Sequence, residues 1–209
     1  MQLIEIIRQY VRRIMRKIAL VINKLSRGRI SPNFITMVGF LAHIPIALLI
    51  ANDSFQLAAI LLVIFGLFDT LDGELARMQG KASPAGMLLD ASTDRMKEVL
   101  LYTGAAYSIT NSDQSSWAFM AVLACGASLC VSYVKAKGES AVATSDKKPS
   151  HTVLNKLFAD GLALFEIRMF ILVVGLLTGQ IVIALSVIAL LASLTAFYRL
   201  YNISKYLSS

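Results

Sequence analysis

Six apolar runs, separated by short polar stretches, constrain the fold of this chain more than any other feature of its 209 residues. The runs cover residues 34–51, 57–68, 99–109, 117–134, 158–178 and 180–198. A helix that crosses a bilayer needs about 20 residues, so the second and third runs are long enough only if the charged stretches 69–77 and 86–98 extend them. The hydrophobic content of 56% also exceeds the value of about 45–50% that is usual for soluble proteins. We therefore predict an all-α integral membrane protein with six transmembrane helices, in which the two charged extensions line a cavity.

The basic residues favour one orientation of these six helices. All 20 Lys and Arg residues lie outside the three connections expected on the exported side, which are 52–54, 110–116 and 178–180. Short cytoplasmic loops retain Lys and Arg, so both termini are predicted to face the cytoplasm, with the protein in the cytoplasmic membrane. The polar stretch 138–152 is predicted to be a cytoplasmic loop. The net charge of +7 is then explained by loops beside anionic lipid headgroups rather than by nucleic acid binding.

The N-terminal segment has a different pattern. Residues 2–25 place apolar side chains at intervals of three and four residues, with Arg and Lys largely between them. This spacing predicts an amphipathic helix that lies on the inner leaflet, and it is also compatible with a simple topology signal. We divide the chain into a juxtamembrane helix at 1–29 and a six-helix domain at 30–209.

Four aspartates lie in the two charged extensions. Asp69 and Asp72 are three residues apart, Asp90 and Asp94 are four apart, and each pair shares one face of a helix. If a turn around 80–84 joins the two helices as a hairpin, the four carboxylates lie at the same depth. Carboxylates close together beside hydrocarbon need compensating cations. Ligation by oxygen alone favours Mg²⁺, with Mn²⁺ as an alternative, over zinc.

The complete spacing D-x-x-D-G-x-x-A-R-x8-G-x3-D-x3-D, which begins at Asp69, resembles the signature of the CDP-alcohol phosphotransferase family at every position. This resemblance implies a six-helix membrane enzyme whose aspartates face a cavity open to the cytoplasm. It implies that Asp69, Asp72 and Asp90 bind metal, and that Asp94 is both a metal ligand and the catalytic base. The implied reaction joins a CDP-activated lipid to an alcohol and releases CMP.

The same resemblance implies a binding site for the donor, which would be CDP-diacylglycerol or a related CDP-lipid. Gly73 has no side chain, which would let the donor approach the helix surface, and Arg77 would meet a phosphate. The predicted CDP-lipid site comprises Pro32, Asn33, Asp69, Gly73, Arg77 and Ser83.

Four basic residues near the cytoplasmic ends or inner portions of the last three predicted spans are candidates for the acceptor site. They are Lys135, Lys137, Arg168 and Arg199. Arg168 falls inside an apolar run, where an unpaired guanidinium is costly and a functional partner is expected. The two lysines are explained equally well as charged helix ends. A basic pocket beside the metal site would select an acceptor that carries a phosphate.

The branch of the family is indicated by further segments. Residues 89–95 and 132–139 resemble the prokaryotic phosphatidylinositol phosphate synthases, which implies inositol 1-phosphate as acceptor and a homodimer. Phe165 and Lys137 stand where that branch usually has arginine, and the Pro32-Asn33 pair resembles the glycerophosphate branch, so glycerol 3-phosphate stays an alternative. A six-span cation transporter is the alternative of another class, although no related halves are apparent in the sequence.

Overall fold

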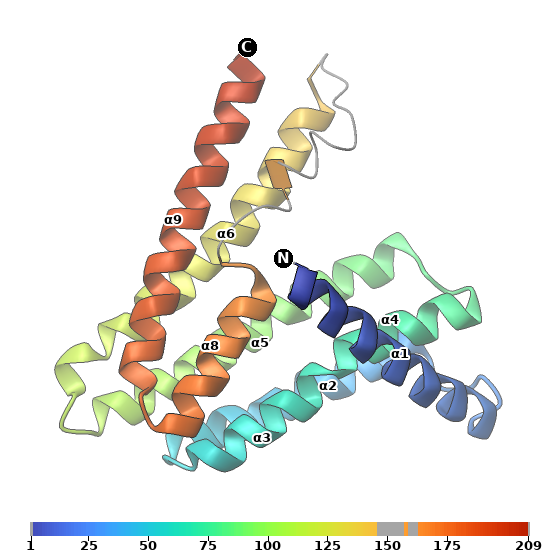
Figure 1. Cartoon of the computed structure of the whole chain (residues 1–209), viewed down its shortest axis with the longest axis horizontal. Coiled ribbons are helices and arrows are strands. Elements are labelled where there is room, and N and C mark those ends of the chain that lie inside the picture. Colours follow the sequence, from blue (N-terminus) through green and yellow to red (C-terminus); the bar gives the residue numbers. More distant parts are fainter. Residues whose placement is uncertain (1, 146–156, 159–162, 209) are drawn as a thin grey trace. The chain divides into compact units, whose positions relative to one another are not determined.

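The computed structural model describes residues 2–145, 157–158 and 163–208, and within these ranges every regular element is a helix (Figure 1). The elements are α1 (Gln2–Leu25), α2 (Pro32–Ala51), α3 (Phe55–Gly66), α4 (Phe68–Gln79), α5 (Pro84–Thr110), the 3-10 helix η1 (Ser115–Trp117), α6 (Phe119–Ala143), α8 (Phe165–Thr178) and α9 (Ile181–Ser208). The all-α prediction is therefore confirmed for the described residues. The chain divides into an N-terminal unit, Met1–Leu101, and a C-terminal unit, Tyr102–Ser209.

Four helical stretches among the described residues are long and apolar enough to cross a membrane. They are Pro32–Ala51, Phe55–Gln79, Ser115–Ala143 and Ile181–Ser208. Their large apolar side chains are often exposed: Leu48 is 59% exposed, Ile60 53% and Leu190 61%. Apolar surface of this extent is costly in water and is compatible with lipid, so these helices suit a membrane protein. Helix α5, which carries the second aspartate pair, and α8, which has 14 residues, are not among the four.

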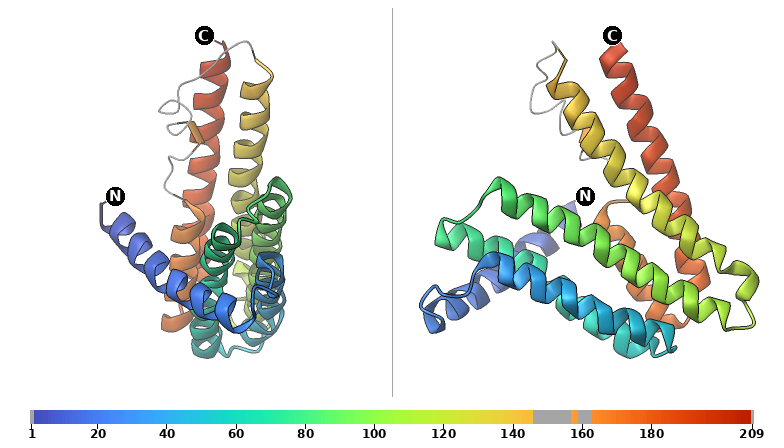
Figure 2. Two further views of the ribbon diagram at one scale, coloured as in Figure 1. Left: turned by 90° about the vertical axis from the view of Figure 1, so that its right-hand side faces the viewer. Right: turned by 180° about the vertical axis from the view of Figure 1, so that it is seen from behind.

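In the N-terminal unit, α1 packs along α4, and α2 packs against α3 and α4 (Figure 2). The contact between α1 and α4 is a small buried cluster that includes Met15 and Ala19 from α1 and Leu71 and Leu75 from α4. The side chain of Ala19 is fully buried, and its small size lets the two helices approach closely. This cluster fixes which face of α4 is turned toward α1.

The predicted hairpin between the two acidic helices is present. Helices α3 and α4 are separated by the single residue Leu67, whose backbone stays near helical geometry at φ −74° and ψ −15°. Helix α4 ends at Gly80, which has a φ of +63° that a residue without a side chain adopts at little cost. Ser83 then accepts a hydrogen bond from the Gly86 N–H at 3.1 Å, and Pro84 is the first residue of α5.

In the C-terminal unit, α9 packs along α6 and also contacts α8 (Figure 1). The predicted loop at 138–152 is wrong at its start, because α6 continues to Ala143; most of the rest of this stretch lies outside the described residues. Gly138 explains the difference. A Cβ atom there would lie 2.6 Å from Ile203 Cδ1 and 2.9 Å from Phe158 Cε1, so this glycine serves close helix packing rather than a turn.

Candidate functional site

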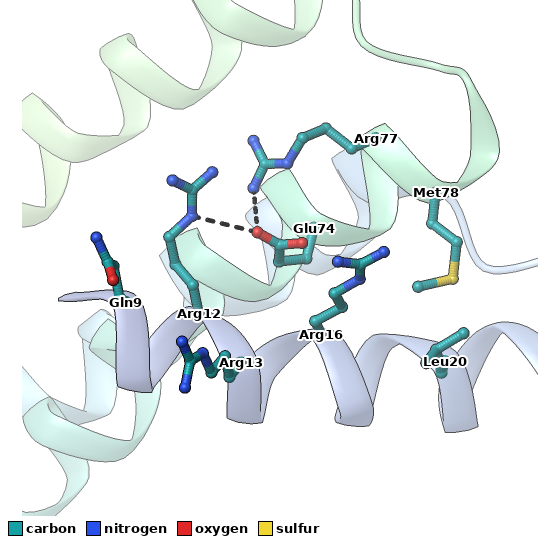
Figure 3. A pocket seen from close by; sticks show the side chains of 8 residues that line it. All are labelled: Gln9, Arg12, Arg13, Arg16, Leu20, Glu74, Arg77 and Met78. Carbon is teal, nitrogen blue, oxygen red and sulfur yellow. Dashed lines mark hydrogen bonds and ion pairs between the residues drawn. The ribbon is translucent and has the colours of Figure 1, made fainter. Parts of the chain in front are cut away.

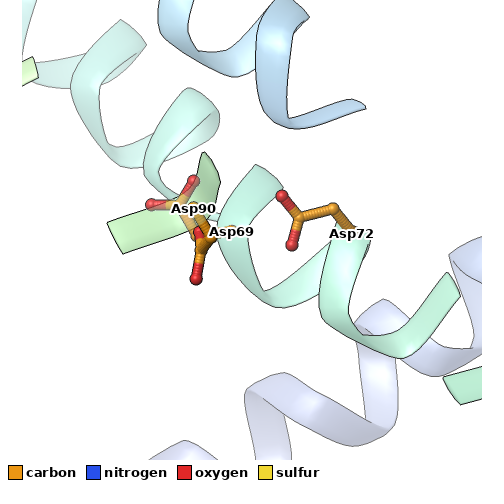
Figure 4. A group of neighbouring side chains, drawn as sticks. All are labelled: Asp69, Asp72 and Asp90. Atoms are coloured by element: carbon orange, nitrogen blue, oxygen red, sulfur yellow. The ribbon is translucent and has the colours of Figure 1, made fainter. Parts of the chain in front are cut away.

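Three of the four predicted aspartates converge in the N-terminal unit. Asp69 and Asp72 project from α4 and Asp90 projects from α5, and one carboxylate oxygen from each lies within 4.8 Å of the others (Figure 4). The convergence follows from local geometry: a spacing of three residues keeps Asp69 and Asp72 on one face of α4, and the hairpin at Gly80 brings the start of α5 alongside that face.

Asp72 is held by Thr36, a residue that no sequence pattern identified. Thr36 Oγ1, on α2, lies 2.5 Å from Asp72 Oδ2 and 3.3 Å from the carbonyl oxygen of Pro32. A hydroxyl group has one proton, so the shorter contact makes Thr36 a donor to the carboxylate. Both side chains are buried, with 4% and 6% exposure. The bond therefore fixes the orientation of a carboxylate that has little access to water.

Asp94 is joined to the cluster through Lys97, a second residue that was not predicted. The ammonium nitrogen of Lys97 lies 2.5 Å from Asp69 Oδ1 and 3.2 Å from Asp94 Oδ1. The Lys97 side chain is only 1% exposed. Its positive charge offsets the repulsion between two carboxylates that come from different helices. Lys97 lies three residues after Asp94, which is the one signal in the sequence that could have identified it.

The oxygen atoms of this cluster fit a divalent cation. Asp90 Oδ1 is buried and has no hydrogen-bond partner among the described residues. A buried carboxylate oxygen without a donor is costly unless a cation can reach it. The three converging groups, Asp69, Asp72 and Asp90, offer only hard oxygen ligands, which is the donor set preferred by Mg²⁺ and Mn²⁺.

Three of the predicted CDP-lipid residues, Gly73, Arg77 and Ser83, belong to the same α4–α5 hairpin as the aspartates. A Cβ atom built on Gly86 would lie 3.4 Å from Ser83 Oγ and 3.6 Å from Asn33 Oδ1, so both polar side chains lie close to a residue that has no side chain. Pro32 is buried at the start of α2. A Cβ atom on Gly73 would lie 3.5 Å from the guanidinium of Arg77. The absence of a side chain at Gly73 thus leaves room for that guanidinium along α4.

Arg77 has a partner that was not expected. Its Nη2 atom lies 2.6 Å from Glu74 Oε1, and the Nε atom of Arg12, from α1, lies 3.3 Å from the same oxygen. Glu74 is nearly buried, with 9% exposure. The predicted phosphate-binding arginine is therefore held by a carboxylate that also ties α4 to the N-terminal helix.

The four predicted acceptor residues all belong to the C-terminal unit. Lys135 and Lys137 are exposed on α6, and Lys135 Nζ lies 3.9 Å from Glu139 Oε1. Arg168 and Arg199 are buried, with 1% and 4% exposure. Arg168 donates to the carbonyl oxygen of Ala163 at 2.5 Å, and Arg199 donates to that of Val131 at 3.4 Å. The two acceptors, Ala163 and Val131, belong to one buried cluster. The two arginines thus approach the same cluster from α8 and α9.

The family model of CDP-alcohol phosphatidyltransferase matches residues 29–191. The chain belongs to this family. The match includes all four aspartates, and it confirms the family that the aspartate spacing predicted.

Curated relatives and solved structures agree with this family. The chain is 36% identical over 121 residues to the phosphatidylinositol phosphate synthase of Corynebacterium glutamicum, which covers 56% of this chain and 55% of that enzyme. It is 28% identical over 176 residues to the archaetidylinositol phosphate synthase of Pyrococcus horikoshii, covering 84% and 85% of the two chains. The chain therefore spans only about half the length of the first relative but most of the second.

The fold is shared with a solved mycobacterial protein. The phosphatidylinositol phosphate synthase of Mycobacterium tuberculosis, solved with CDP-DAG bound, superposes with a TM-score of 0.76 at 23% identity over 91% of this chain and 94% of that one. A second structure of that protein, in complex with manganese and citrate, gives a TM-score of 0.77 at 22% identity over 91% and 88% of the two chains.

Proposed function

We propose that this protein is a membrane transferase that moves a phosphatidyl group, or its ether-lipid counterpart, from a CDP-lipid to inositol 1-phosphate and releases CMP. The observation that carries the proposal is the carboxylate cluster, in which oxygens of Asp69, Asp72 and Asp90 lie within 4.8 Å of one another inside the family spacing. The relatives named as phosphatidylinositol and archaetidylinositol phosphate synthases support inositol phosphate as the acceptor.

The cofactor in this proposal is Mg²⁺, with Mn²⁺ as a substitute. Asp69, Asp72, Asp90 and Asp94 would hold it, and the unpartnered Oδ1 atom of Asp90 supports this assignment. The bound cation would supply positive charge that stabilises the charge developing on the diphosphate and on the departing CMP. The relative solved with manganese is consistent with a divalent ion at these carboxylates.

The residues of the chain have separate tasks in the proposed reaction. Asp94 would accept the proton of the acceptor hydroxyl as that oxygen bonds to the β-phosphorus and the bond from this phosphorus to the bridging oxygen of CMP breaks. The Lys97 ammonium, which donates to Asp94 at 3.2 Å, would hold this carboxylate in position. Arg77 and Gly73, with Pro32, Asn33, Asp69 and Ser83, would bind the CDP part of the donor.

The acceptor phosphate would be bound by Lys135, Lys137, Arg168 and Arg199. Arg168 and Arg199 are the stronger candidates, because both are buried and guanidinium groups recognise phosphate with two parallel hydrogen bonds. Glycerol 3-phosphate carries the same charged group, and the Pro32-Asn33 pair keeps it as the second candidate acceptor. Family membership supports an enzyme rather than the cation transporter.

The membrane arrangement in this proposal has six spans. The second span would combine α3 and α4, and α5 and α8 would complete the set of six with the aspartates in a cavity open to the cytoplasm. Residues 1–29 would form the interfacial helix, because Tyr10, Ile14 and Ile18 of α1 are exposed at one-turn intervals. Residues 30–209 would form the catalytic domain, which we expect to pair as a homodimer in the cytoplasmic membrane.

A panel of acceptors tests the reaction and the acceptor together. The purified chain in detergent is incubated with CDP-diacylglycerol and Mg²⁺, and inositol 1-phosphate, glycerol 3-phosphate, inositol and serine are supplied in parallel. We expect CMP release that depends on metal and is fastest with inositol 1-phosphate, and a lipid product that carries the second phosphate. Preferred use of glycerol 3-phosphate would reject the acceptor, and no CMP release with any acceptor or with an ether-lipid donor would reject the reaction.

Two matched variants test the role of Asp94. Asp94→Asn should abolish CMP release while the CDP-lipid still binds, because the amide cannot accept the hydroxyl proton. Asp113→Asn makes the same substitution in an exposed loop and should retain turnover. Turnover in Asp94→Asn close to that of the unmodified protein is the result that would remove Asp94 from the mechanism.

A further inference from the structure

A basic cavity of about 560 Å³ lies between α1 and α4, within the N-terminal unit (Figure 3). Helix α1 contributes five of its lining residues and α4 contributes three. The lining residues are Gln9, Arg12, Arg13, Arg16, Leu20, Glu74, Arg77 and Met78. Of these, only Arg77 belongs to the predicted CDP-lipid site, and none is an aspartate of the cluster. We call this cavity the α1–α4 pocket.

The charges in the α1–α4 pocket do not balance. Four of its lining residues are arginines and one is a carboxylate. Glu74 pairs with Arg12 and Arg77 through the same oxygen atom. Neither Arg13 nor Arg16 has an ion-pair partner among the described side chains. The pocket therefore holds three positive charges more than it holds negative ones, which attracts an anion.

The pocket is built on a fixed base. Met15 and Ala19 of α1 are buried against Leu71 and Leu75 of α4, which sets the distance between the two helices. Glu74 is 9% exposed and accepts hydrogen bonds from both walls, from Arg12 on α1 and from the arginine on α4. The guanidinium groups of Arg12 and Arg77 are thus oriented by a contact inside the protein, which lowers the cost of ordering these two groups when a ligand binds.

We propose that the α1–α4 pocket binds the phosphate group of an anionic lipid headgroup, at a site separate from the carboxylate cluster. Several guanidinium groups facing one cavity match the oxygens of a phosphate ester, and the volume lies in the range of about 300–1,000 Å³ that is usual for small-ligand sites. The apolar side chains of Tyr10 and Val21, which are 64% and 57% exposed, favour a helix at the membrane surface, where the commonest phosphate esters are lipid headgroups.

Binding of a soluble short-chain lipid tests this site without a membrane surface. Dihexanoylphosphatidic acid is titrated into the full chain in neutral detergent with EDTA, and binding is measured by calorimetry. Inorganic phosphate is titrated in a second arm. We expect saturable binding at one site per chain. If the lipid binds and inorganic phosphate does not, the ligand is a lipid headgroup. If both bind equally well, the ligand is the free anion, and either outcome supports a phosphate site. If neither binds, the proposal is overturned.

Two double variants on the same helix separate the pocket from general charge attraction. Arg13→Gln with Arg16→Gln removes two lining charges and should weaken binding about 10- to 100-fold. Lys17→Gln with Lys24→Gln removes two exposed charges of α1 that do not line the pocket. At about 0.15 M salt this variant should change the affinity less than about threefold, because exposed charges that do not touch the ligand are weakened by salt. Equal losses in the two variants would overturn the site.

A competition arm separates this site from the donor site. CMP added in excess should leave the binding of dihexanoylphosphatidic acid unchanged, because only Arg77 is shared with the predicted CDP-lipid residues. Displacement by CMP would assign the pocket to the donor and overturn the proposal. The assay contains no metal, donor lipid or acceptor, so its result is independent of whether the proposed transfer reaction occurs.

Discussion

Replacing Lys97 by methionine should make the stability of the protein depend on a divalent metal. The Lys97 ammonium lies 2.5 Å from Asp69 Oδ1 and 3.2 Å from Asp94 Oδ1, and its side chain is 1% exposed. Methionine has a similar length and no charge, so Lys97→Met removes the cation and largely keeps the volume. Two carboxylates from different helices then face each other without the group that joins them.

The size of the effect follows from this burial. Removing one partner of a buried ion pair costs about 3–5 kcal/mol, because the remaining charge is left uncompensated. For a chain of this length, 1 kcal/mol corresponds to about 2–4 °C in the unfolding temperature, so we expect a fall of about 6–20 °C in metal-free protein. A divalent ion at the carboxylates should restore much of this loss, since a ligand at 100 times its Kd adds about 2.7 kcal/mol.

The assay is thermal unfolding in detergent, measured by scanning fluorimetry with EDTA and across a series of Mn²⁺ concentrations. The variant should unfold at a lower temperature in EDTA, and its unfolding temperature should rise more steeply with Mn²⁺ than that of the unmodified protein. The steeper rise is expected because a positive charge beside two metal ligands has been removed, which strengthens the attraction of the site for a cation.

Lys135→Met is the matched control. Lys135 and Glu139 form an ion pair at 3.9 Å whose side chains are 49% and 52% exposed, and such pairs contribute about 0–1 kcal/mol. The control should therefore unfold close to the temperature of the unmodified protein. An equal fall in both variants, or a Lys97→Met protein whose stability ignores Mn²⁺, would refute the role assigned to Lys97.

Two further substitutions test the contacts around the site and the packing of the C-terminal unit. Thr36→Val removes the donor to Asp72 Oδ2 and should weaken Mn²⁺ binding about 10- to 100-fold, as measured by electron paramagnetic resonance. Thr36→Ser keeps the hydroxyl group and should bind Mn²⁺ like the unmodified protein. An unchanged affinity in Thr36→Val would remove Thr36 from the site. Gly138→Ala places a Cβ atom 2.6 Å from Ile203 Cδ1 and should destabilise the fold by about 1–3 kcal/mol. In Gly126→Ala of the same helix, the added atom meets nothing within 4 Å, so this variant should be neutral or more stable by about 0.5–1 kcal/mol. Equal effects of Gly138→Ala and Gly126→Ala on stability would refute the packing role of Gly138.

The convergence of the aspartates could be predicted because it depends on local geometry. Spacings of three and four residues fix the helix faces. Gly80, which follows the first acidic helix, implies a tight turn into the second. The same local rules were insufficient at Gly138, where a run of small and polar residues predicted a loop and the helix continues. There the deciding contacts come from Ile203 and Phe158, which are distant in sequence.

The partners of the site residues could not be predicted for the same reason. Thr36 reaches Asp72 from α2, and Arg12 reaches Glu74 from α1 across 62 positions of sequence. These pairings depend on how whole helices pack, which no periodicity in a single segment encodes. The missed residues are therefore those that hold the predicted ones in place.

The four aspartate carboxylates carry more negative charge than the neighbouring basic side chains offset. Four aspartates close together need compensating cations, and Lys97 supplies one of them from inside the protein. Arg95 lies 3.8 Å from Asp94 Oδ2, but it also pairs with Glu98, so these two neighbours offset each other. Four carboxylates and one ammonium leave about three negative charges at a buried site, which is more than a single internal cation can neutralise. This remaining charge is why we expect the carboxylates to take a divalent cation from solution while Lys97 holds Asp69 and Asp94 together in its absence.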